Sequence, residues 1–265
     1  MSPATDQDFK AQFGEDRLLA KHFDNKSQGY YIEIGVYDGV QCSNSYYFEK
    51  LGWHGLLIEA DPNLLDQCRQ NRPNARLINC AVVAPNMPQK VSFEIVLGWR
   101  ALSSLSVRRH RRGEYVGDNF ETTTITVPAR TLDDILAELS PSQIDFITID
   151  VEGDEWGVLE GFSIRQWHPE IVITERNMYL PDPRIVNYFH KNGYLYLRTT
   201  GGINDWFYLS NSGKPNLCYH LWLFIVYWLP SYALQFVVSP LKKTIKSLLT
   251  KIGLWESIRS LAGRK

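Results

Sequence analysis

Cysteine is scarce in this sequence, and the few cysteines present do not form a recognisable set. Cys42, Cys68, Cys80 and Cys218 are widely spaced, and no Cys-x-x-Cys pair occurs. The first ten residues are polar and do not resemble a secretory leader. Dispersed thiols without a leader indicate a reducing compartment, and they argue against both a zinc finger and a disulfide framework.

Charge is missing from one stretch and concentrated in the next. Residues 216–240 contain no Asp, Glu, Lys or Arg, whereas residues 241–265 carry a net charge of +6 and the rest of the chain −7. In the basic stretch, aliphatic residues recur at helical spacing with lysines between them, which is typical of an amphipathic helix on an anionic membrane surface. We therefore expect a domain over residues 1–212 and an extension over 213–265, which contacts such a surface through residues 217–265.

The uncharged stretch is long enough to cross a bilayer, but the charge distribution argues against a crossing. A full span would place the +6 tail outside, against the positive-inside bias. The sequence therefore favours a cytoplasmic protein, peripheral or monotopic on the inner face of a membrane. The alternative is that this stretch packs on the domain or forms a homo-oligomer interface. The net negative charge of the body disfavours nucleic acid as a partner.

Strand-like and helix-like segments alternate through the first two hundred residues, with no internal repeat. This alternation predicts an α/β fold with a mostly parallel Rossmann-like sheet, one antiparallel strand and ligands bound beyond the carboxyl ends of the strands. Strands are expected at 29–34, 55–59, 76–82, 91–97, 144–149, 171–174, 194–199 and 206–209, and helices at 40–51, 63–72, 131–139, 155–161 and 184–191.

The first turn lacks the third glycine of a dinucleotide-binding loop. Only Gly35 and Gly39 are present, with three other residues between them. A pyrophosphate needs the backbone amides of Gly-x-Gly-x-x-Gly, and it would be repelled by Glu33 and Asp38. The same two acids favour a cofactor that carries positive charge, such as S-adenosylmethionine with its ammonium and sulfonium groups. An ordinary strand turn is the alternative.

Candidate cofactor contacts also follow the second and third predicted strands. Glu59 closes the second strand, where a carboxylate can hold the two hydroxyls of a ribose, and Asp61 follows it in the turn. Asn79 and Ala81 end the third strand and are candidates to line an adenine. A purely structural role in the sheet is an equal alternative for these last two residues.

Three segments together resemble the FkbM-type methyltransferases: residues 31–39, 57–62 and 149–155, the last reading Asp-Val-Glu-Gly-Asp-Glu from Asp150. The resemblance covers about residues 12 to 210. It implies a Rossmann-like methyltransferase fold, S-adenosylmethionine as donor, and transfer to a hydroxyl oxygen of a sugar, glycolipid or natural product. Carried over by position, it places Glu33, Gly35, Asp38 and Gly39 in the cofactor loop, Glu59 on the ribose, and Asp150 and Glu152 at the site floor. Many members carry Asp where this chain has Glu33.

A sugar hydroxyl is a poor nucleophile, so a base or a metal ion would help the transfer. The candidate catalytic residues at the strand ends are Asp150, Glu152 and Glu175, with His110 on an uncertain loop. A Mg²⁺ ion held by Asp150, Glu175 and Asn177 is a second version of this site. The structural alternative is that the acids cap the next helix. The basic cluster at residues 108–112 is either a surface turn or a patch that attracts an anionic acceptor.

Two other classes of protein compete with a methyltransferase. A nicotinamide-dependent oxidoreductase requires the missing third glycine. A catalytically inactive membrane scaffold is opposed by the presence of Gly35, Glu59 and Asp150. The expected tail contact with a membrane favours a saccharide or lipid-linked acceptor.

Overall fold

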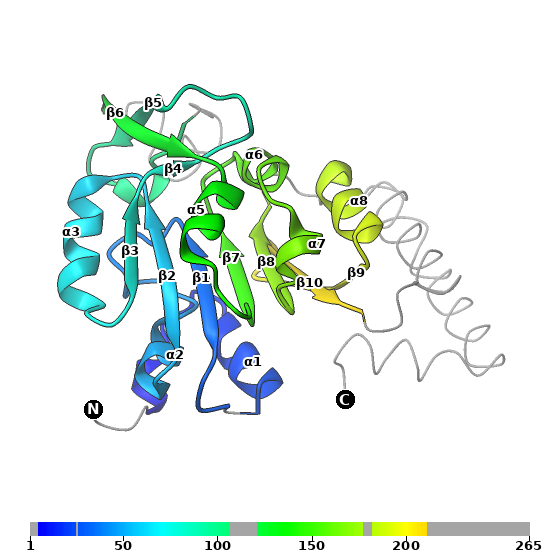
Figure 1. Cartoon of the computed structure of the whole chain (residues 1–265). Helices are drawn as coiled ribbons and strands as arrows, with labels where there is room; N and C mark the ends of the chain where they lie inside the picture. The colour runs from blue at the N-terminus through cyan, green and yellow to red at the C-terminus, as the bar shows by residue number, and fades with distance from the viewer. Residues whose placement is uncertain (1–4, 25, 106–120, 177–181, 211–265) are drawn as a thin grey trace, which may run out of the picture.

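The computed structural model describes residues 5–24, 26–105, 121–176 and 182–210, and they form two β-sheets with helices packed on the larger one (Figure 1). The seven-stranded sheet has the order β3-β2-β1-β7-β8-β10-β9, and a three-stranded sheet has the order β4-β6-β5. The large sheet contains β1 (Tyr30–Ile34), β2 (His54–Glu59), β3 (Arg76–Asn79), β7 (Phe146–Ile149), β8 (Ile171–Glu175), β9 (Tyr194–Thr200) and β10 (Asn204–Leu209).

Neighbouring strands of the large sheet run parallel except around β10, which is antiparallel to both β8 and β9. Neighbouring parallel strands need a long crossover connection, which the helices supply here, whereas the tight turn from β9 to β10 reverses the chain direction. The predicted Rossmann-like sheet with one antiparallel strand is therefore confirmed.

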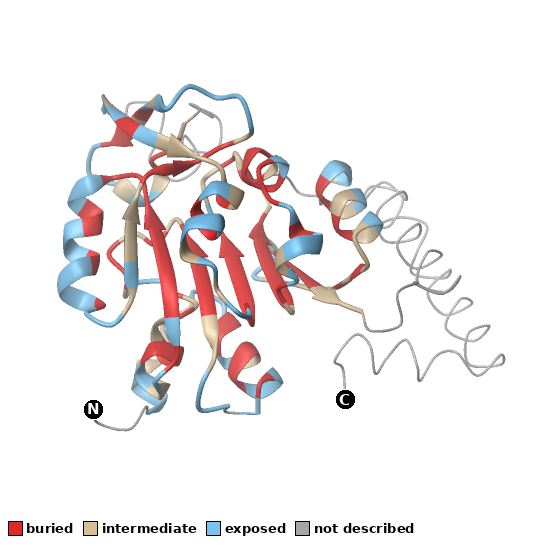
Figure 2. Cartoon of the chain, in the orientation of Figure 1, coloured by how far each residue is buried: buried red, intermediate tan, exposed pale blue. Residues whose placement is uncertain are grey.

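Both faces of the large sheet are buried, because successive strand residues point to opposite sides. On one face Tyr31 and Leu57 pack against α1 (Glu15–His22), α2 (Tyr46–Leu51) and α3 (Pro62–Asn71). On the other face Ile32 and Ile34 pack against α5 (Leu132–Leu139), α6 (Glu155–Glu160), α7 (Ile164–Trp167) and α8 (Pro183–Lys191). Figure 2 shows the buried strands enclosed between helices whose outer sides are exposed. The result is a three-layer α/β/α domain, to which a short 3-10 helix, η1 (Asp6–Asp8), is added near the N-terminus.

Side-chain caps begin three of these helices. Thr131 caps α5 by accepting a hydrogen bond from the backbone N–H of Asp134, as the sequence predicts. Asp61 and Asp182 cap α3 and α8 in the same way, each followed by a proline whose fixed backbone angle suits the first helical position.

Two predicted elements differ from the structure. The helix expected over 40–51 begins only at Tyr46, since Gly39 and Cys42 both have positive φ angles and cannot lie inside an α-helix. The strand expected over 76–82 is two strands, because the chain leaves the large sheet after Asn79 and continues as β4 (Ala81–Val82) in the small sheet.

The small sheet lies over the end of the large sheet at which its parallel strands finish (Figure 1). It consists of β4, β5 (Lys90–Val96) and β6 (Thr122–Arg130), and a 3-10 helix, η2 (Arg100–Leu102), follows β5. The sequence predicted β5 but not β6, whose threonines alternate with few apolar residues. This arrangement places the residues that follow β5 close to the predicted ligand-binding edge.

Several predictions fall on parts of the chain that the structure leaves undescribed. The extension over 213–265, the basic cluster over 108–112, His110 and Asn177 all lie outside the described residues. Within the described part of the chain, no helix is both long and apolar enough to cross a membrane.

Candidate functional site

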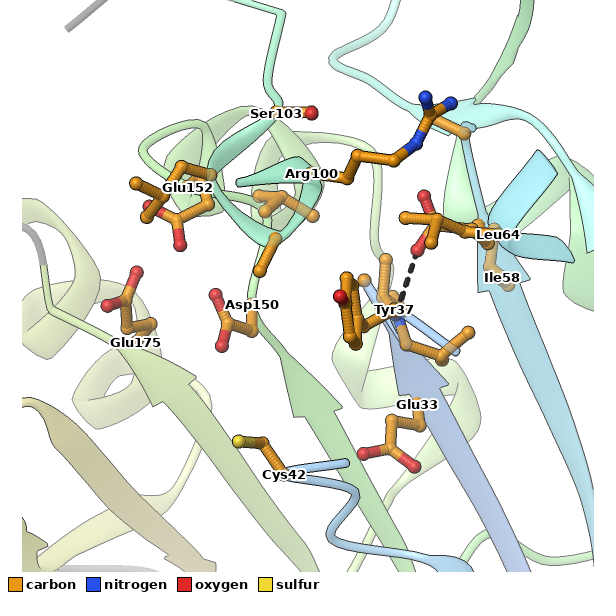
Figure 3. Close-up of a pocket in the computed structure, with 18 of the residues that line it drawn as sticks. Glu33, Tyr37, Cys42, Ile58, Leu64, Arg100, Ser103, Asp150, Glu152 and Glu175 are labelled. Atoms are coloured by element: carbon orange, nitrogen blue, oxygen red, sulfur yellow. Dashed lines mark hydrogen bonds between the residues drawn. The ribbon is translucent and has the colours of Figure 1, made fainter. Parts of the chain in front are cut away.

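A cavity of about 530 Å³ opens where β1, β2, β7 and β8 end, below the small sheet (Figure 3). Residues of the β1 turn, the ends of β2, β7 and β8, and the 98–105 segment all contribute to its wall. The predicted site residues that line it are Glu33, Gly35, Glu59, Ala81, Asp150, Glu152 and Glu175.

Gly35 allows the ends of β1 and β7 to meet at the floor of this cavity. Its φ angle is +78°, and a Cβ atom at this position would lie 1.7 Å from the backbone oxygen of Asp150. No other residue type fits so close to a neighbouring backbone, so the glycine predicted from the sequence is required by the sheet itself. Because glycine has no side chain, the first turn is also open to a ligand.

Glu59, at the end of β2, lies in the cavity wall with its side chain buried. Its carboxylate accepts hydrogen bonds from the backbone N–H groups of Val36 and Tyr37, both at 3.1 Å, and from that of Asp61 at 2.9 Å. Burial raises the pKa of Glu59 to about 7, and the neighbouring Asp61 adds to the effect. The carboxylate thus fixes the turn after β1 and can still accept hydrogen bonds from a ligand.

Glu33 also lies at the cavity but is engaged by the protein. The side-chain hydroxyls of Ser43 and Ser45 and the backbone N–H of Asn44 all donate to its carboxylate, at 2.9, 2.5 and 2.8 Å. These bonds tie the loop before α2 to the end of β1. Glu33 therefore brings negative charge to the site and holds the loop in place.

Asp38 and Gly39 lie outside the cavity wall, in the part of the turn that supports it. Asp38 accepts hydrogen bonds from the backbone N–H groups of Val40 and Gln41, both at 2.8 Å. Gly39 has a φ angle of +79°, and a Cβ atom there would come within 2.9 Å of the Arg72 side chain. Their predicted role in the cofactor loop corresponds in the structure to shaping the loop.

Arg72 lies beneath this turn and is almost completely buried, at 1% exposure. Its guanidinium donates to Glu49 at 2.6 Å, to the backbone oxygen of Gly39 at 2.9 Å, and to the hydroxyls of Tyr31 and Ser45, both at 2.9 Å. The negative charge of Glu49, together with these bonds, keeps the pKa of Arg72 raised despite its burial. The ion pair with Glu49 joins the end of α3 to α2, and the bond to Gly39 joins Arg72 to the turn after β1.

Asp61, Asn79 and Ala81 surround the end of β2. Asp61 pairs with Arg100 of η2, whose Nε lies 2.7 Å from an Asp61 oxygen. Asn79 donates to the backbone oxygens of Glu59 and Ala60, and Ala81 lines the cavity directly. Of the three, Asp61 and Asn79 support the wall rather than form it.

Asp150, Glu152 and Glu175 come together on the opposite side of the cavity (Figure 3). One carboxylate oxygen from each lies within 4.8 Å of the others. Asp150 is exposed, Glu152 partly exposed and Glu175 buried, so the three carboxylates connect the open cavity with the interior. The structure thus places the three predicted catalytic residues in one cluster, which we call the acidic trio.

Glu155 holds the backbone of the acidic trio in shape. Its buried carboxylate accepts hydrogen bonds from the backbone N–H of Gly153 at 2.9 Å and from that of Val151 at 3.4 Å. Burial, reinforced by the nearby charge of Glu175, raises the pKa of Glu155 to about 7. The sequence motif that ends at Glu155 therefore folds into a turn that closes on itself.

Left-handed backbone conformations gather at this site. Tyr37, Cys42 and Glu152 all line the cavity and have φ angles of +52°, +58° and +55°. Such conformations are disfavoured for residues with a side chain, and they concentrate at functional sites where surrounding contacts enforce them. Their clustering supports the assignment of this cavity as the functional site.

Several residues that line or support the cavity carry no signal in the sequence. Arg72 and Arg100 look like ordinary surface cations of a helix and a loop, and Gln12, Asn44 and Thr148 belong to no motif. Only their partners in three dimensions reveal them.

The family comparison matches the site. A family model, the methyltransferase FkbM domain, covers residues 33–196 and so includes the turn after β1, the end of β2 and the acidic trio. No curated protein sequence gives a significant match.

Solved structures show only distant likenesses. A TehB-like SAM-dependent methyltransferase from Corynebacterium glutamicum is 13% identical, with 75% of this chain and 89% of that chain covered and a TM-score of 0.41. The METTL16 methyltransferase domain is 14% identical over 73% and 65% of the two chains, with a TM-score of 0.43. A precorrin-6y C5,15-methyltransferase from Geobacter metallireducens is 12% identical over 77% and 95%, with a TM-score of 0.41.

Likenesses this distant carry no argument about chemistry, so the assignment rests on the family model, on the strand order and on the site. The family model covers more than half of the chain, and its range contains the cavity residues at the ends of β1, β2, β7 and β8. The chain belongs to the FkbM methyltransferase domain family, whose members are S-adenosylmethionine-dependent methyltransferases.

Proposed function

We propose that this protein transfers the methyl group of S-adenosylmethionine to a hydroxyl oxygen of a saccharide-bearing acceptor. The observation that carries the proposal is the acidic trio of Asp150, Glu152 and Glu175, with its oxygens within 4.8 Å of one another in the cavity that Glu59 and Gly35 also line. Membership of the family identifies the methyl donor as S-adenosylmethionine. The acidic trio provides the basic oxygens that can take a proton from a hydroxyl acceptor.

The residues on one side of the cavity bind the methyl donor, and those on the other side bind the acceptor. S-adenosylmethionine, when bound, supplies a methyl group made electrophilic by the positive sulfur. Glu59, Ala81 and Gly35 all line the cavity, where Glu59 would accept hydrogen bonds from the ribose hydroxyls, Ala81 would contact the adenine, and the Gly35 turn would let the ligand approach the backbone. The acidic trio faces the acceptor and aligns its hydroxyl group for an in-line displacement.

Asp150 is the best placed of the three acids to remove the acceptor's proton. It is exposed to the cavity, whereas Glu175 is buried and Glu152 is only partly exposed. A base must reach the hydroxyl within hydrogen-bonding distance, and an accessible carboxylate can do so. Glu175 and Glu152 then add negative charge that favours proton removal by a neighbouring group.

Mg²⁺ is a second way for the same cluster to act, and it stays a prediction. Three carboxylates of this spacing fit the oxygen ligands that Mg²⁺ accepts, and the ion would lower the pKa of a bound hydroxyl. Turnover that persists after dialysis against EDTA supports a carboxylate base that acts without a metal ion. Turnover that is lost and then restored by added Mg²⁺ supports the ion.

Contact with a membrane through residues 217–265 would bring a lipid-linked saccharide to this cavity. The charge pattern of the extension supports this part of the proposal. Its test compares the full chain with a chain that ends at Ser212, each mixed with anionic phospholipid vesicles and sedimented. Loss of vesicle binding in the shorter chain alone supports the proposal. If neither chain sediments with the vesicles, the membrane contact is wrong.

The acceptor can be sought by methyl labelling. The full chain is incubated with S-adenosylmethionine labelled in the methyl group and with a membrane extract, and the lipid-soluble and water-soluble fractions are separated. We expect label in a lipid-soluble saccharide, with a methyl ether linkage that resists mild alkali. Label confined to water-soluble compounds, to proteins or to an amine would contradict the proposed acceptor.

Glu59→Gln is expected to weaken binding of S-adenosylhomocysteine and to remove its pH dependence. The ribose hydroxyls donate to the ionised carboxylate, and the pKa of Glu59 is about 7. Binding by the wild type should therefore strengthen about tenfold as the pH rises from 6 to 8, since the ionised fraction rises by that factor. In the variant the affinity should stay flat across this range and lie about tenfold or more below the wild-type affinity at pH 8.

Isothermal titration calorimetry at three pH values checks this prediction. Glu138→Gln, on the exposed side of α5, is the matched control and should keep the wild-type pH dependence. A wild-type affinity that does not change between pH 6 and pH 8 would contradict the role of Glu59 in holding the ribose.

A further inference from the structure

Two buried oxygens in the cavity wall have no hydrogen-bond partner among the described residues. They are Oγ1 of Thr148, a residue only 3% exposed on β7, and Oδ1 of Asn44, in the loop before α2. A buried polar atom without a partner is destabilising, and native proteins retain few of them. Both residues line the same cavity, which indicates that a ligand bound there supplies the missing partner.

Both residues lie against Glu33. Thr148 is paired with Glu33 in the register of β1 and β7, and paired residues of neighbouring strands point to the same face of the sheet. Asn44 donates its backbone N–H to the Glu33 carboxylate at 2.8 Å. The two unpartnered oxygens therefore flank a buried negative charge.

The Glu33 carboxylate itself is already occupied by protein donors. Ser43 and Ser45 donate to one of its oxygens, and the Asn44 backbone donates to the other. Its charge still attracts a cation, because hydrogen bonds do not cancel the charge. The N–H donors of such a cation can be accepted by the nearby neutral oxygens of Thr148 and Asn44.

We infer that Thr148 and Asn44 bind the α-ammonium group of S-adenosylmethionine, an assignment that rests on the proposed function. The ammonium is the charged donor at the amino-acid end of the ligand, and Glu59 holds the ribose across the Gly35 turn. Both oxygens are closed to solvent in the free protein, so the contact requires each side chain to turn toward the cavity when the ligand binds. Glu33 positions the loop and supplies the charge, while Thr148 and Asn44 make the contacts.

The test compares two ligands that differ in the amino-acid end, which carries the α-ammonium group. S-adenosylhomocysteine carries the amino-acid end, whereas 5′-methylthioadenosine keeps the nucleoside and lacks that end. Calorimetric titration of the full chain should show that Thr148→Val weakens binding of S-adenosylhomocysteine about tenfold and leaves binding of 5′-methylthioadenosine unchanged. Asn44→Ala should show the same selectivity, which keeps the test open if one variant folds poorly.

Thermal stability separates this role from a structural one. Thr148→Val removes a hydroxyl that has no partner in the free protein, so the melting temperature of the free variant should stay equal or rise. Thr174→Val is the matched control: its hydroxyl, equally buried on the neighbouring strand, donates to the backbone oxygen of Glu175. That control should melt lower and bind both ligands as the wild type does.

The possible outcomes are distinct. If Thr148→Val and Asn44→Ala weaken the binding of both ligands equally, or weaken the binding of neither, the assignment is overturned. Water would then be the partner of the two oxygens. If the wild type binds neither compound, the cofactor assignment fails and the subsite fails with it. Weaker binding of S-adenosylhomocysteine with unchanged binding of 5′-methylthioadenosine supports the proposed subsite.

Discussion

Replacing Asp150 with asparagine is expected to lower the methyl-transfer rate by about 10²–10⁴-fold while leaving the affinity for S-adenosylhomocysteine within about threefold. The amide has nearly the shape of the carboxylate and can still accept a hydrogen bond, but it cannot take a proton from a hydroxyl group. Asp150 is the exposed member of the acidic trio, so its neighbours cannot replace it without moving. The measurement is the initial rate of label transfer to the membrane extract.

The control for this variant is a carboxylate on the same domain that does not line the cavity. Asp66→Asn changes an exposed carboxylate of α3 that pairs with Arg69, and the rate should stay at the wild-type value. A normal rate in Asp150→Asn would exclude Asp150 as the base. A loss of S-adenosylhomocysteine affinity as large as the loss of rate would instead assign Asp150 to the methyl donor.

Replacing Arg72 with methionine is expected to lower the free energy of unfolding by about 3–5 kcal/mol. The methionine fills a similar volume but leaves the Glu49 carboxylate buried without its cation, only 5% of its surface being exposed. The change also removes the donors that hold Gly39 and Ser45 in the turn after β1. The affinity for S-adenosylhomocysteine should therefore fall together with the stability.

Chemical denaturation measures the change in the free energy of unfolding, and two further variants show whether it comes from the buried ion pair. Arg69→Met removes a cation from an exposed pair on the same helix and should cost less than about 1 kcal/mol. The double variant Arg72→Met with Glu49→Gln should recover part of the lost stability, because no buried charge is then left unpaired. A cost for Arg72→Met no larger than that for Arg69→Met would contradict the structural role of this ion pair.

The sequence reveals the strand ends of this site because local rules govern them. Gly35 is recognisable because a strand that turns sharply toward a ligand favours glycine, and Glu59 and Glu175 stand where buried strands stop. The carboxyl ends of parallel strands meet at one edge, so Asp150 and Glu175 are expected to lie near each other, whereas Glu152 is placed at the site by the family resemblance. For the same reason the sheet with its single antiparallel strand is predictable from the alternation of elements.

Long-range pairings could not be read in this way. The charge of Arg72 gives no sign that it is buried, because its partner Glu49 lies 23 positions away on another element. Glu33, Asp38 and Gly39 are recognisable as a motif, but the motif does not reveal that their contacts are mostly with the loop itself. The β6 strand escaped prediction because its sequence is mostly polar and rich in threonine, with few apolar residues to mark a buried strand.

Titration of the full-length protein with S-adenosylhomocysteine by isothermal calorimetry tests the central claim most directly. The claim predicts saturable binding of one ligand per chain, with a dissociation constant on the order of 1 μM to 1 mM, the usual range of KM values. It also predicts no saturable binding of NADH or NADPH, since the turn after β1 lacks the glycines that a pyrophosphate requires. Saturable binding of a nicotinamide dinucleotide, or the absence of any S-adenosylhomocysteine binding, would contradict the assignment.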